Sequence, residues 1–131
     1  MPFNCTRKSS LLIPSGPAHD RDRKHLFVLI TDRCANHSHL GVPICSIDPG
    51  VRHDAACILE GGVHEFLAQP SYAMYQFARI MHHANVSHMV DLNQFIPKAD
   101  LTEEVCEKIR NGLLESRFVS KLIKKYFQDE G

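Results

Sequence analysis

A continuous apolar run, Leu26 to Ile30, constrains the fold of this chain more than any other stretch of its sequence. The run is rich in strand formers, and no polar residue alternates with the apolar ones. A strand here therefore has apolar side chains on both of its faces. Such a strand is buried on both faces, which requires packed structure on each side of its sheet. The run is also far too short to span a membrane as a helix.

Further strand signals follow this run. Residues 41–47 read as a second strand, in which Pro43 predicts an edge position or a strand start, because proline cannot donate a backbone hydrogen bond. Residues 48–50 form a strong Asp-Pro-Gly turn. A third strand is predicted over 55–59 and a fourth, short one over 63–68.

The segment 72–80 is ambiguous from its residues alone. Ser71 could cap a helix that starts after it. The aromatic residues of the segment suit a strand equally well. Local propensity therefore leaves both structures open for this segment.

The C-terminal part predicts amphipathic helices packed on the sheet. Residues 100–103 have the spacing of a capping box, with Asp100 in the capping position. Val105, Ile109 and Leu113 recur at helical spacing, and Gly112 can end or bend this first helix. The predicted buried stripe continues beyond it through Leu114, Phe118 and Leu122, with Val119, Ile123 and Phe127 beside it.

The bulk properties indicate one α+β domain. The chain has 131 residues, which suits one core, and we divide it into a flexible N-terminal arm over 1–23 and a single domain over 24–131. The net charge is zero, so nucleic-acid contact would need a local basic patch. Five cysteines without a pairing motif favour reduced thiols and a cytoplasmic location. Two groups of basic residues flank an acidic middle: Arg7, Lys8, Arg21, Arg23, Lys24 and Arg33, and then Lys121, Lys124 and Lys125.

Cysteine and histidine residues gather before residue 65. Cys34, His37 and His39 form one group, and His53 and Cys57 follow at a spacing of four. These spacings match no tetrahedral zinc motif, so the sequence predicts neither a metal site nor a cofactor. A metal-dependent hydrolase that uses the first group stays as a weaker alternative. The adjacent His82 and His83 point in different directions and are interpreted as surface residues.

Polar residues among the strand signals suggest another chemistry. Cleavage of RNA through its 2′-hydroxyl needs a base, an acid and a cation for the phosphate, which histidine, arginine and a hydroxyl supply without metal. Each residue also has a structural interpretation, since a histidine can be a hydrogen-bonding scaffold and a tyrosine a core aromatic. The candidates are Ser46, His64, Ser71, Tyr72 and Arg79.

Two stretches resemble a known family. The run 26–30 followed by Gly-Val-Pro-Ile-Cys-Ser at 41–46 resembles the core of the PemK/MazF-like toxins, whose Pro-[Ile/Val]-Thr-Ser-like tetrapeptide reads Pro-Ile-Cys-Ser here. The stretch 57–75 resembles a bacterial and phage subgroup with the pattern C-x-L-x-x-G-x-H-x-F-[IL]-x-x-x-S-Y-x-x-Y. The resemblance covers 24–127.

This resemblance implies a small SH3-like β-barrel with C-terminal amphipathic helices, and it favours a strand over 72–80. It implies a homodimer, an antitoxin partner and metal-independent endoribonuclease activity. No membrane association is expected, because no apolar run is long enough to span a membrane. The alternative is a non-enzymatic protein-binding module of phage or mobile-element origin. As catalytic residues we predict His64, Ser46 and Arg79, with His64 as acid or base, and as RNA-binding residues His25, Ser71 and Tyr72.

Overall fold

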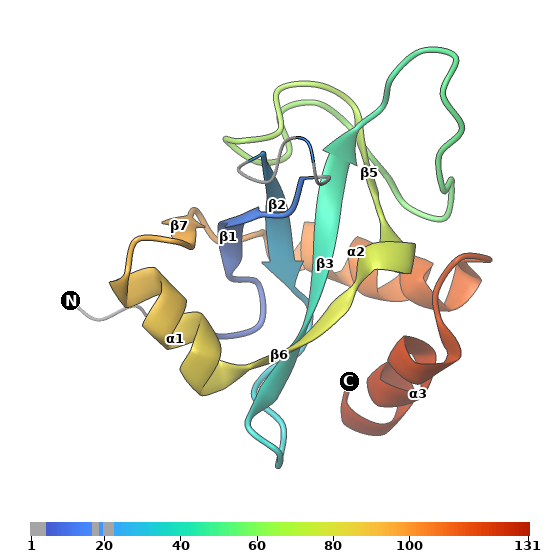
Figure 1. Ribbon diagram of the computed structural model, residues 1–131. Helices are drawn as coiled ribbons and strands as arrows, with labels where there is room; N and C mark the ends of the chain where they lie inside the picture. The colour runs from blue at the N-terminus through green and yellow to red at the C-terminus, as the bar shows by residue number, and fades with distance from the viewer. Residues whose placement is uncertain (1–4, 17–18, 20–22) are drawn as a thin grey trace.

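The computed structural model describes residues 5–16, 19 and 23–131, and it shows a mixed α+β fold (Figure 1). Within these residues, seven strands form one antiparallel sheet, accompanied by three α-helices and one 3-10 helix. In chain order the elements are β1 (Ser10–Pro14), β2 (Lys24–Leu29), β3 (Ser38–Ser46), β4 (Ile58–Leu59), β5 (Ser71–Ala73), η1 (Tyr75–Phe77), β6 (Arg79–His82), α1 (His83–Asp91), β7 (Ile96–Lys98), α2 (Glu103–Glu115) and α3 (Lys121–Glu130).

The sheet has the strand order β4-β5-β3-β2-β1-β7, and β6 pairs with the same side of β3 as β5. β4 and β7 are the end strands, and no ladder joins them within the described residues, so the sheet is not closed into a barrel. The register places Leu26 opposite Ile44 and Leu11 opposite Phe27.

The two faces of the sheet have separate apolar cores, and the strand over Leu26–Ile30 contributes to both. Leu26, Val28 and Ile30 belong to a core shared with α2 and α3, on the side that we call the α2 face. Phe27 and Leu29 belong to a second core with Val86 of α1, on the α1 face. Figure 1 shows α1 on one side of the sheet and α2 on the other. The prediction of a strand buried on both faces is confirmed.

Pro43 lies in the middle of the central strand β3, so the prediction of an edge position or a strand start is wrong. The Met74 N–H donates to the Pro43 carbonyl across 2.8 Å, which orients this residue toward the side where β5 ends and η1 begins. The N–H and C=O of one strand residue point to the same side, so the proline nitrogen also faces this interruption. No ladder bond is lost, because β5 and β6 leave a gap at that position.

Residues 10–14 form β1, a buried strand between β2 and β7, so the predicted flexible arm over 1–23 is wrong there. Leu11 and Ile13 pack on the α1 face, whereas Leu12 packs on the α2 face. Five residues without polar alternation carry little local signal, and pairing with β2 decides their conformation. Residues 1–4, 17–18 and 20–22 of the predicted arm lie outside the described residues.

The middle of the chain is less regular than predicted. The third predicted strand is reduced to Ile58–Leu59, and residues 63–68 form turns instead of a strand. The favoured strand over 72–80 forms only at its two ends, because η1 separates β5 from β6. Helix α1 and strand β7 were not predicted.

The C-terminal part is helical, as predicted, and it forms the two helices α2 and α3. Thr102, not Asp100, caps α2, since its side chain accepts a hydrogen bond from the Val105 N–H. α2 continues through Gly112, which is buried. The continued stripe is wrong for Phe118 and Leu122, which are 54% and 70% exposed, because Ser120 starts α3 as a new helix with Ile123 turned inward. Val119, Ile123 and Phe127 do contact the core, as predicted. No helix among the described residues is long and apolar enough to cross a membrane.

The turn after β4 connects the two ends of the sheet through side chains. His64 is only 5% exposed, and its Nε2 lies 2.7 Å from the Ala99 carbonyl, just after β7, and 3.1 Å from the Ser10 hydroxyl in β1. The Glu65 carboxylate accepts from the Ala99 N–H at 3.2 Å. The strands at the two ends are thus joined by side-chain hydrogen bonds in place of a ladder.

Candidate functional site

A pocket of about 130 Å³ opens on the α1 face, beyond the area covered by α1. It combines a histidine, an arginine and a serine with apolar walls. Its lining residues are Ser15, His25, Phe27, Pro43, Met74, Phe77 and Arg79. The strand register explains this grouping, because Phe27 stands opposite Pro43 and Arg79 stands opposite Gly41, all on the same face.

His25 is held in one orientation by Ser15. The Ser15 hydroxyl donates to the Ile13 carbonyl at 3.1 Å, and its oxygen lies 2.7 Å from His25 Nδ1. Because the Ser15 hydroxyl donates its proton to the Ile13 carbonyl, its oxygen must accept from His25. His25 therefore donates from Nδ1 and carries its lone pair on Nε2. Burial lowers the pKa of His25 below its usual 6.5, and the charges of Arg23 and Arg79 lower it further. His25 is therefore a neutral base at pH 7.

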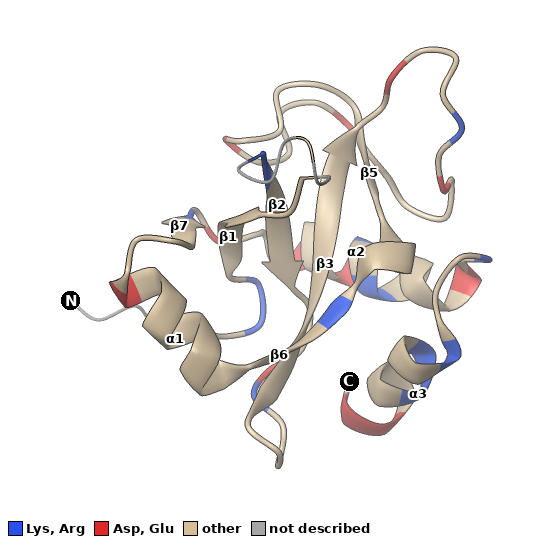
Figure 2. Ribbon diagram, viewed as in Figure 1, with Lys and Arg blue, Asp and Glu red and all other residues tan. Residues whose placement is uncertain are grey.

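Arg79 is positioned by an aromatic ring and not by a carboxylate. Its guanidinium carbon lies 4.9 Å from the centroid of the Phe27 ring, a cation–π contact. Within the part of the chain that the structure describes, Arg79 has no carboxylate within ion-pair distance, whereas Arg7 pairs with Glu103 and Glu107 of α2. Figure 2 marks a basic position on β6, which corresponds to this arginine. Its charge is thus available to an anion.

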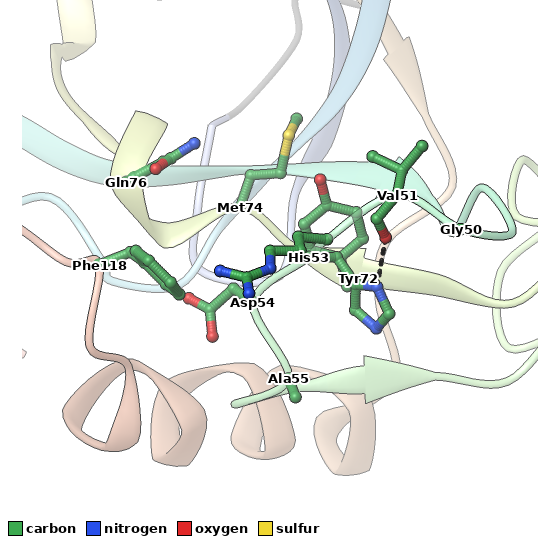
Figure 3. A pocket seen from close by; sticks show the side chains of 10 residues that line it. Gly50, Val51, His53, Asp54, Ala55, Tyr72, Met74, Gln76 and Phe118 are labelled. Carbon is green, nitrogen blue, oxygen red and sulfur yellow. Dashed lines mark hydrogen bonds between the residues drawn. The ribbon is translucent and has the colours of Figure 1, made fainter.

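A larger pocket of about 730 Å³ adjoins the first one and shares Met74 with it (Figure 3). We call the two pockets together the Met74 cleft. The Tyr72 and His53 rings lie 5.2 Å apart in the larger pocket, and Phe118 lies at its other end. Its lining residues are Gly50, Val51, Arg52, His53, Asp54, Ala55, Tyr72, Met74, Gln76 and Phe118.

Asp54 fixes the loop that forms one wall of the larger pocket. Its carboxylate accepts from the Ser116 hydroxyl at 2.5 Å and from the Ala56 N–H at 3.0 Å. The Ser116 oxygen in turn accepts from the Phe118 N–H at 3.1 Å. The loop after β3 is thereby attached to the connection between α2 and α3. Both oxygens of the Asp54 carboxylate are engaged in these hydrogen bonds.

The predicted site residues separate between the two faces of the sheet. His25, Tyr72 and Arg79 lie on the α1 face and line the Met74 cleft. Ser46 and Ser71 are paired across β3 and β5 and fall on the other face by strand alternation. The Ser71 hydroxyl is buried and donates to the Gln69 carbonyl at 3.0 Å. Neither serine lines the cleft.

His64 lies apart from the cleft, in the turn that joins the sheet ends. His64 does not reach solvent as the predicted acid or base would have to, because its side chain is buried and both ring nitrogens are engaged within the fold. Its Nδ1 accepts from the Phe66 N–H at 3.0 Å, so its Nε2 carries the proton donated to Ala99. This arrangement is that of a structural histidine.

Ser15 lines the cleft and Cys45 lies beside it, and neither was among the predicted site residues. Cys45 stands opposite Tyr72, so it places its thiol on the α1 face beside that ring. Burial raises the pKa of the thiol. Strand alternation from Phe27 and Pro43 could have assigned Cys45 to this face, whereas nothing local indicates that Ser15 holds His25.

The predicted cysteine–histidine group does not assemble. Cys34 accepts a hydrogen bond from the Tyr126 hydroxyl at 3.1 Å, and His37 contacts Arg33. His83 is half-buried, so its interpretation as a surface residue is wrong. Among the described residues, one set of three ligand-type side chains converges, and it consists of Cys5, His39 and His83.

No family model matches the chain, and no curated protein matches it either. The resemblance to PemK/MazF-like toxins is therefore supported only by the residues that suggested it. A function can therefore be inferred only from the chemistry of the residues in the Met74 cleft.

Proposed function

We propose that this protein binds single-stranded RNA in the Met74 cleft and cleaves it without a metal ion. The observation that carries the proposal is the placement of His25 and Arg79 in one pocket. His25 supplies a neutral base with a fixed orientation. Arg79 supplies a cation without a carboxylate partner among the described residues. A base and a cation beside each other are what 2′-hydroxyl attack on a phosphodiester requires.

The roles follow from the protonation states. His25 Nε2 takes the proton of the 2′-hydroxyl, and the resulting oxygen attacks the adjacent phosphorus. Arg79 stabilises the charge on the phosphate oxygens as it develops. The 5′-oxygen leaves with a proton, for which Tyr72 is the candidate donor. Its pKa is raised, mainly by burial and also by Cys45, so the phenol stays protonated.

The larger pocket of the cleft is suited to unstacked bases. Base recognition in single-stranded RNA relies on stacking against aromatic side chains. Phe118 in this pocket and Phe77 in the smaller one are both 54% exposed, and Tyr72 is half-buried next to His53. Arg52 also lines the larger pocket and adds a positive charge there. Local charge of this kind is compatible with the zero net charge of the chain.

The proposal extends to the family. For the fold we propose an open, SH3-like arrangement of the antiparallel sheet, in which the side chain of His64 and not a ladder joins the two ends. We further propose that the protein acts as a toxin in the cytoplasm, that it forms a homodimer, and that an antitoxin protein binds it.

The test is cleavage of a labelled single-stranded RNA by the purified chain. We expect His25→Ala to lower the rate by about 10²–10⁴-fold, as is typical when a general base is lost. Arg79→Ala should lower it by about 10²–10³-fold. Arg33→Ala and His88→Ala are the matched controls, since both residues are exposed and lie outside the cleft.

The substrate offers a second control. An RNA with 2′-deoxyribose at the cleaved position should bind and remain intact, because the attacking hydroxyl is missing. A chelator should leave the cleavage rate unchanged. Wild-type protein that neither binds nor cleaves RNA, or a His25→Ala variant as active as Arg33→Ala, would overturn the proposal.

A second function, a protein-binding module, is favoured by exposed apolar side chains at the junction of α2 and α3. Leu114, Phe118 and Leu122 are 43%, 54% and 70% exposed. Large exposed apolar groups close together are typical of interaction surfaces. If this surface joins two copies of the chain, Leu122→Ser should weaken the dimer in sedimentation experiments, whereas Leu92→Ser in the exposed C-cap of α1 should not.

A further inference from the structure

We infer that Cys5, His39 and His83 form a binding site for a zinc-class divalent metal ion. Each residue offers one ligand atom, and these atoms all lie within 4.8 Å of one another. The three residues come from the segment before β1, from β3 and from the start of α1, so only the folded chain brings them together. The site is separate from the Met74 cleft and does not depend on the function proposed for it.

The orientation of His39 is the first observation that points to a metal. His39 is fully buried, and its Nδ1 lies 3.2 Å from the Thr31 carbonyl. A carbonyl can only accept, so Nδ1 carries the proton and the lone pair is on Nε2. A ligating histidine in metalloproteins is generally oriented by such a hydrogen bond from its other ring nitrogen.

The distances fit a tetrahedral ion after small movements. His39 Nε2 and His83 Nδ1 lie 2.9 Å apart, with ring centroids 5.2 Å apart. Zinc binds nitrogen at about 2.0–2.1 Å and sulfur at about 2.3 Å, which separates tetrahedral ligand atoms by about 3.3–3.7 Å. The two nitrogens are slightly closer together than this separation, and the sulfur lies within 4.8 Å of both nitrogens.

The donor set selects the class of ion. One thiol and two imidazoles form a borderline-soft set, which favours zinc over magnesium or calcium. The thiolate of Cys5 would offset part of the charge of the ion. His83 is half-buried at the beginning of α1, so a water molecule can take the fourth position.

Bound metal would connect three segments of the α1 face. Cys5 belongs to the same core as Phe27 and Val86 and is nearly inaccessible to solvent. A metal ion there would hold the segment before β1 against β3 and α1. The melting temperature of the protein should therefore rise when zinc is added, because an ion that binds only the folded state stabilises it.

The experiment uses the full chain without a histidine tag. Metal is removed with a chelator, zinc is added back, and the bound zinc is measured after desalting. Wild-type protein should retain about one equivalent of zinc, as a single three-ligand site requires. Cobalt should give the charge-transfer absorption of a thiolate ligand, which Cys5→Ser should abolish.

Variants distinguish the site from adventitious binding. Cys5→Ser and His83→Gln should each lower zinc affinity by more than the roughly 10–100-fold that losing an outer-shell partner costs. Cys34→Ser and His82→Gln are the matched controls and should bind like wild type. If Cys5→Ser does not fold, His83→Gln, at a less buried position, still carries the test. Less than a tenth of an equivalent in wild type, or unchanged affinity in His83→Gln, overturns the inference.

Discussion

The two faces of the sheet differ in how far they are covered. On the α2 face, two helices close over a core of largely inaccessible side chains. On the α1 face, a single helix covers one end, and the other end opens into the pocket that contains His25 and Arg79. Both proposed sites, the cleft and the metal site, lie on the face with less cover. The more fully covered α2 face contributes most of the packed core, whereas the more open α1 face holds both of the sites that we propose.

One strand serves both purposes. Along β2, Leu26 and Val28 face the α2 core, whereas His25 and Phe27 face the other side. Alternation with a period of two allows this division without any break in the strand. A rigid strand whose other face is fully packed is a good support for His25, whose orientation matters to the proposed chemistry.

The largest expected effect on stability tests the role of the α2 face. Leu113→Ala should lower the free energy of unfolding by about 2–5 kcal/mol, because Leu113 lies on the buried side of α2 and its truncation leaves a cavity. Leu122→Ala should change it by less than about 0.5 kcal/mol, since that side chain is exposed. Urea denaturation measures both. Similar losses for the two variants would remove the distinction between covered and exposed helix positions.

His64 tests whether the connection between the sheet ends is structural. His64→Ala should cost about 1–3 kcal/mol, because it removes the bond to the Ala99 carbonyl and leaves the Phe66 N–H without its acceptor in a buried turn. RNA cleavage by the folded variant should proceed at the wild-type rate. His53→Ala, at an exposed position, is the stability control. A variant with unchanged stability and lost cleavage would return His64 to the catalytic role that we first predicted.

Gly112 tests how tightly α2 is packed on the sheet. A Cβ there would collide with Tyr75 Oη and lie 2.9 Å from Cys57 Cβ. Tyr75 cannot easily move, because its hydroxyl donates to the Ile109 carbonyl at 2.7 Å. Gly112→Ala should therefore destabilise by about 1–3 kcal/mol, despite the better helix propensity of alanine. Thermal melting measures the loss.

A double variant makes the cause of that loss specific. Adding Tyr75→Phe removes the colliding oxygen, so the combined loss should be smaller than the sum of the two single losses. Additive losses would show that the contact between α2 and η1 is not responsible. The result would then weaken the view of the α2 face as closely packed.

The smallest expected effect concerns the charge environment of the α1 face. The pKa of His25 lies below 6.5 because of burial and then the positive charges of Arg23 and Arg79. Arg79→Ala removes one of those charges, so the pKa should rise, as followed by NMR titration of the imidazole. Arg33→Ala should leave it unchanged. Equal pKa values in wild type and Arg79→Ala would mean that the two side chains do not share a pocket in solution.

The same lowered pKa sets a direction for stability against pH. The folded state binds the His25 proton more weakly than the unfolded state does. Above about pH 6.5 His25 is neutral in both states and contributes no pH dependence. As the pH falls below that value, the unfolded state takes up the proton first, and stability decreases. The acid limb of the cleavage rate should lie below pH 6.5 for the same reason.

The sequence by itself determined the features that depend on local pattern. The apolar run predicted a strand buried on both faces, and helical spacing predicted α2 with Ile109 and Leu113 inward. Three of the predicted site residues, His25, Tyr72 and Arg79, do line one cleft. Strand parity and helical period are properties of neighbouring residues, so they can be read before the fold is known.

Only the tertiary structure decided which distant residues meet. Local pattern gave no strand at Ser10–Pro14, because partners from β2 and β7 make it one. It placed Phe118 inside, whereas a new helix start at Ser120 turns that side chain outward. Cys5, His39 and His83 are separated by more than thirty residues at each step, and their spacing carries no metal motif. Long-range contacts are selected by the packing of the whole chain. For this reason the sequence pattern could assign His64 a catalytic role that its buried position does not support, and it could not bring His39 together with Cys5 and His83.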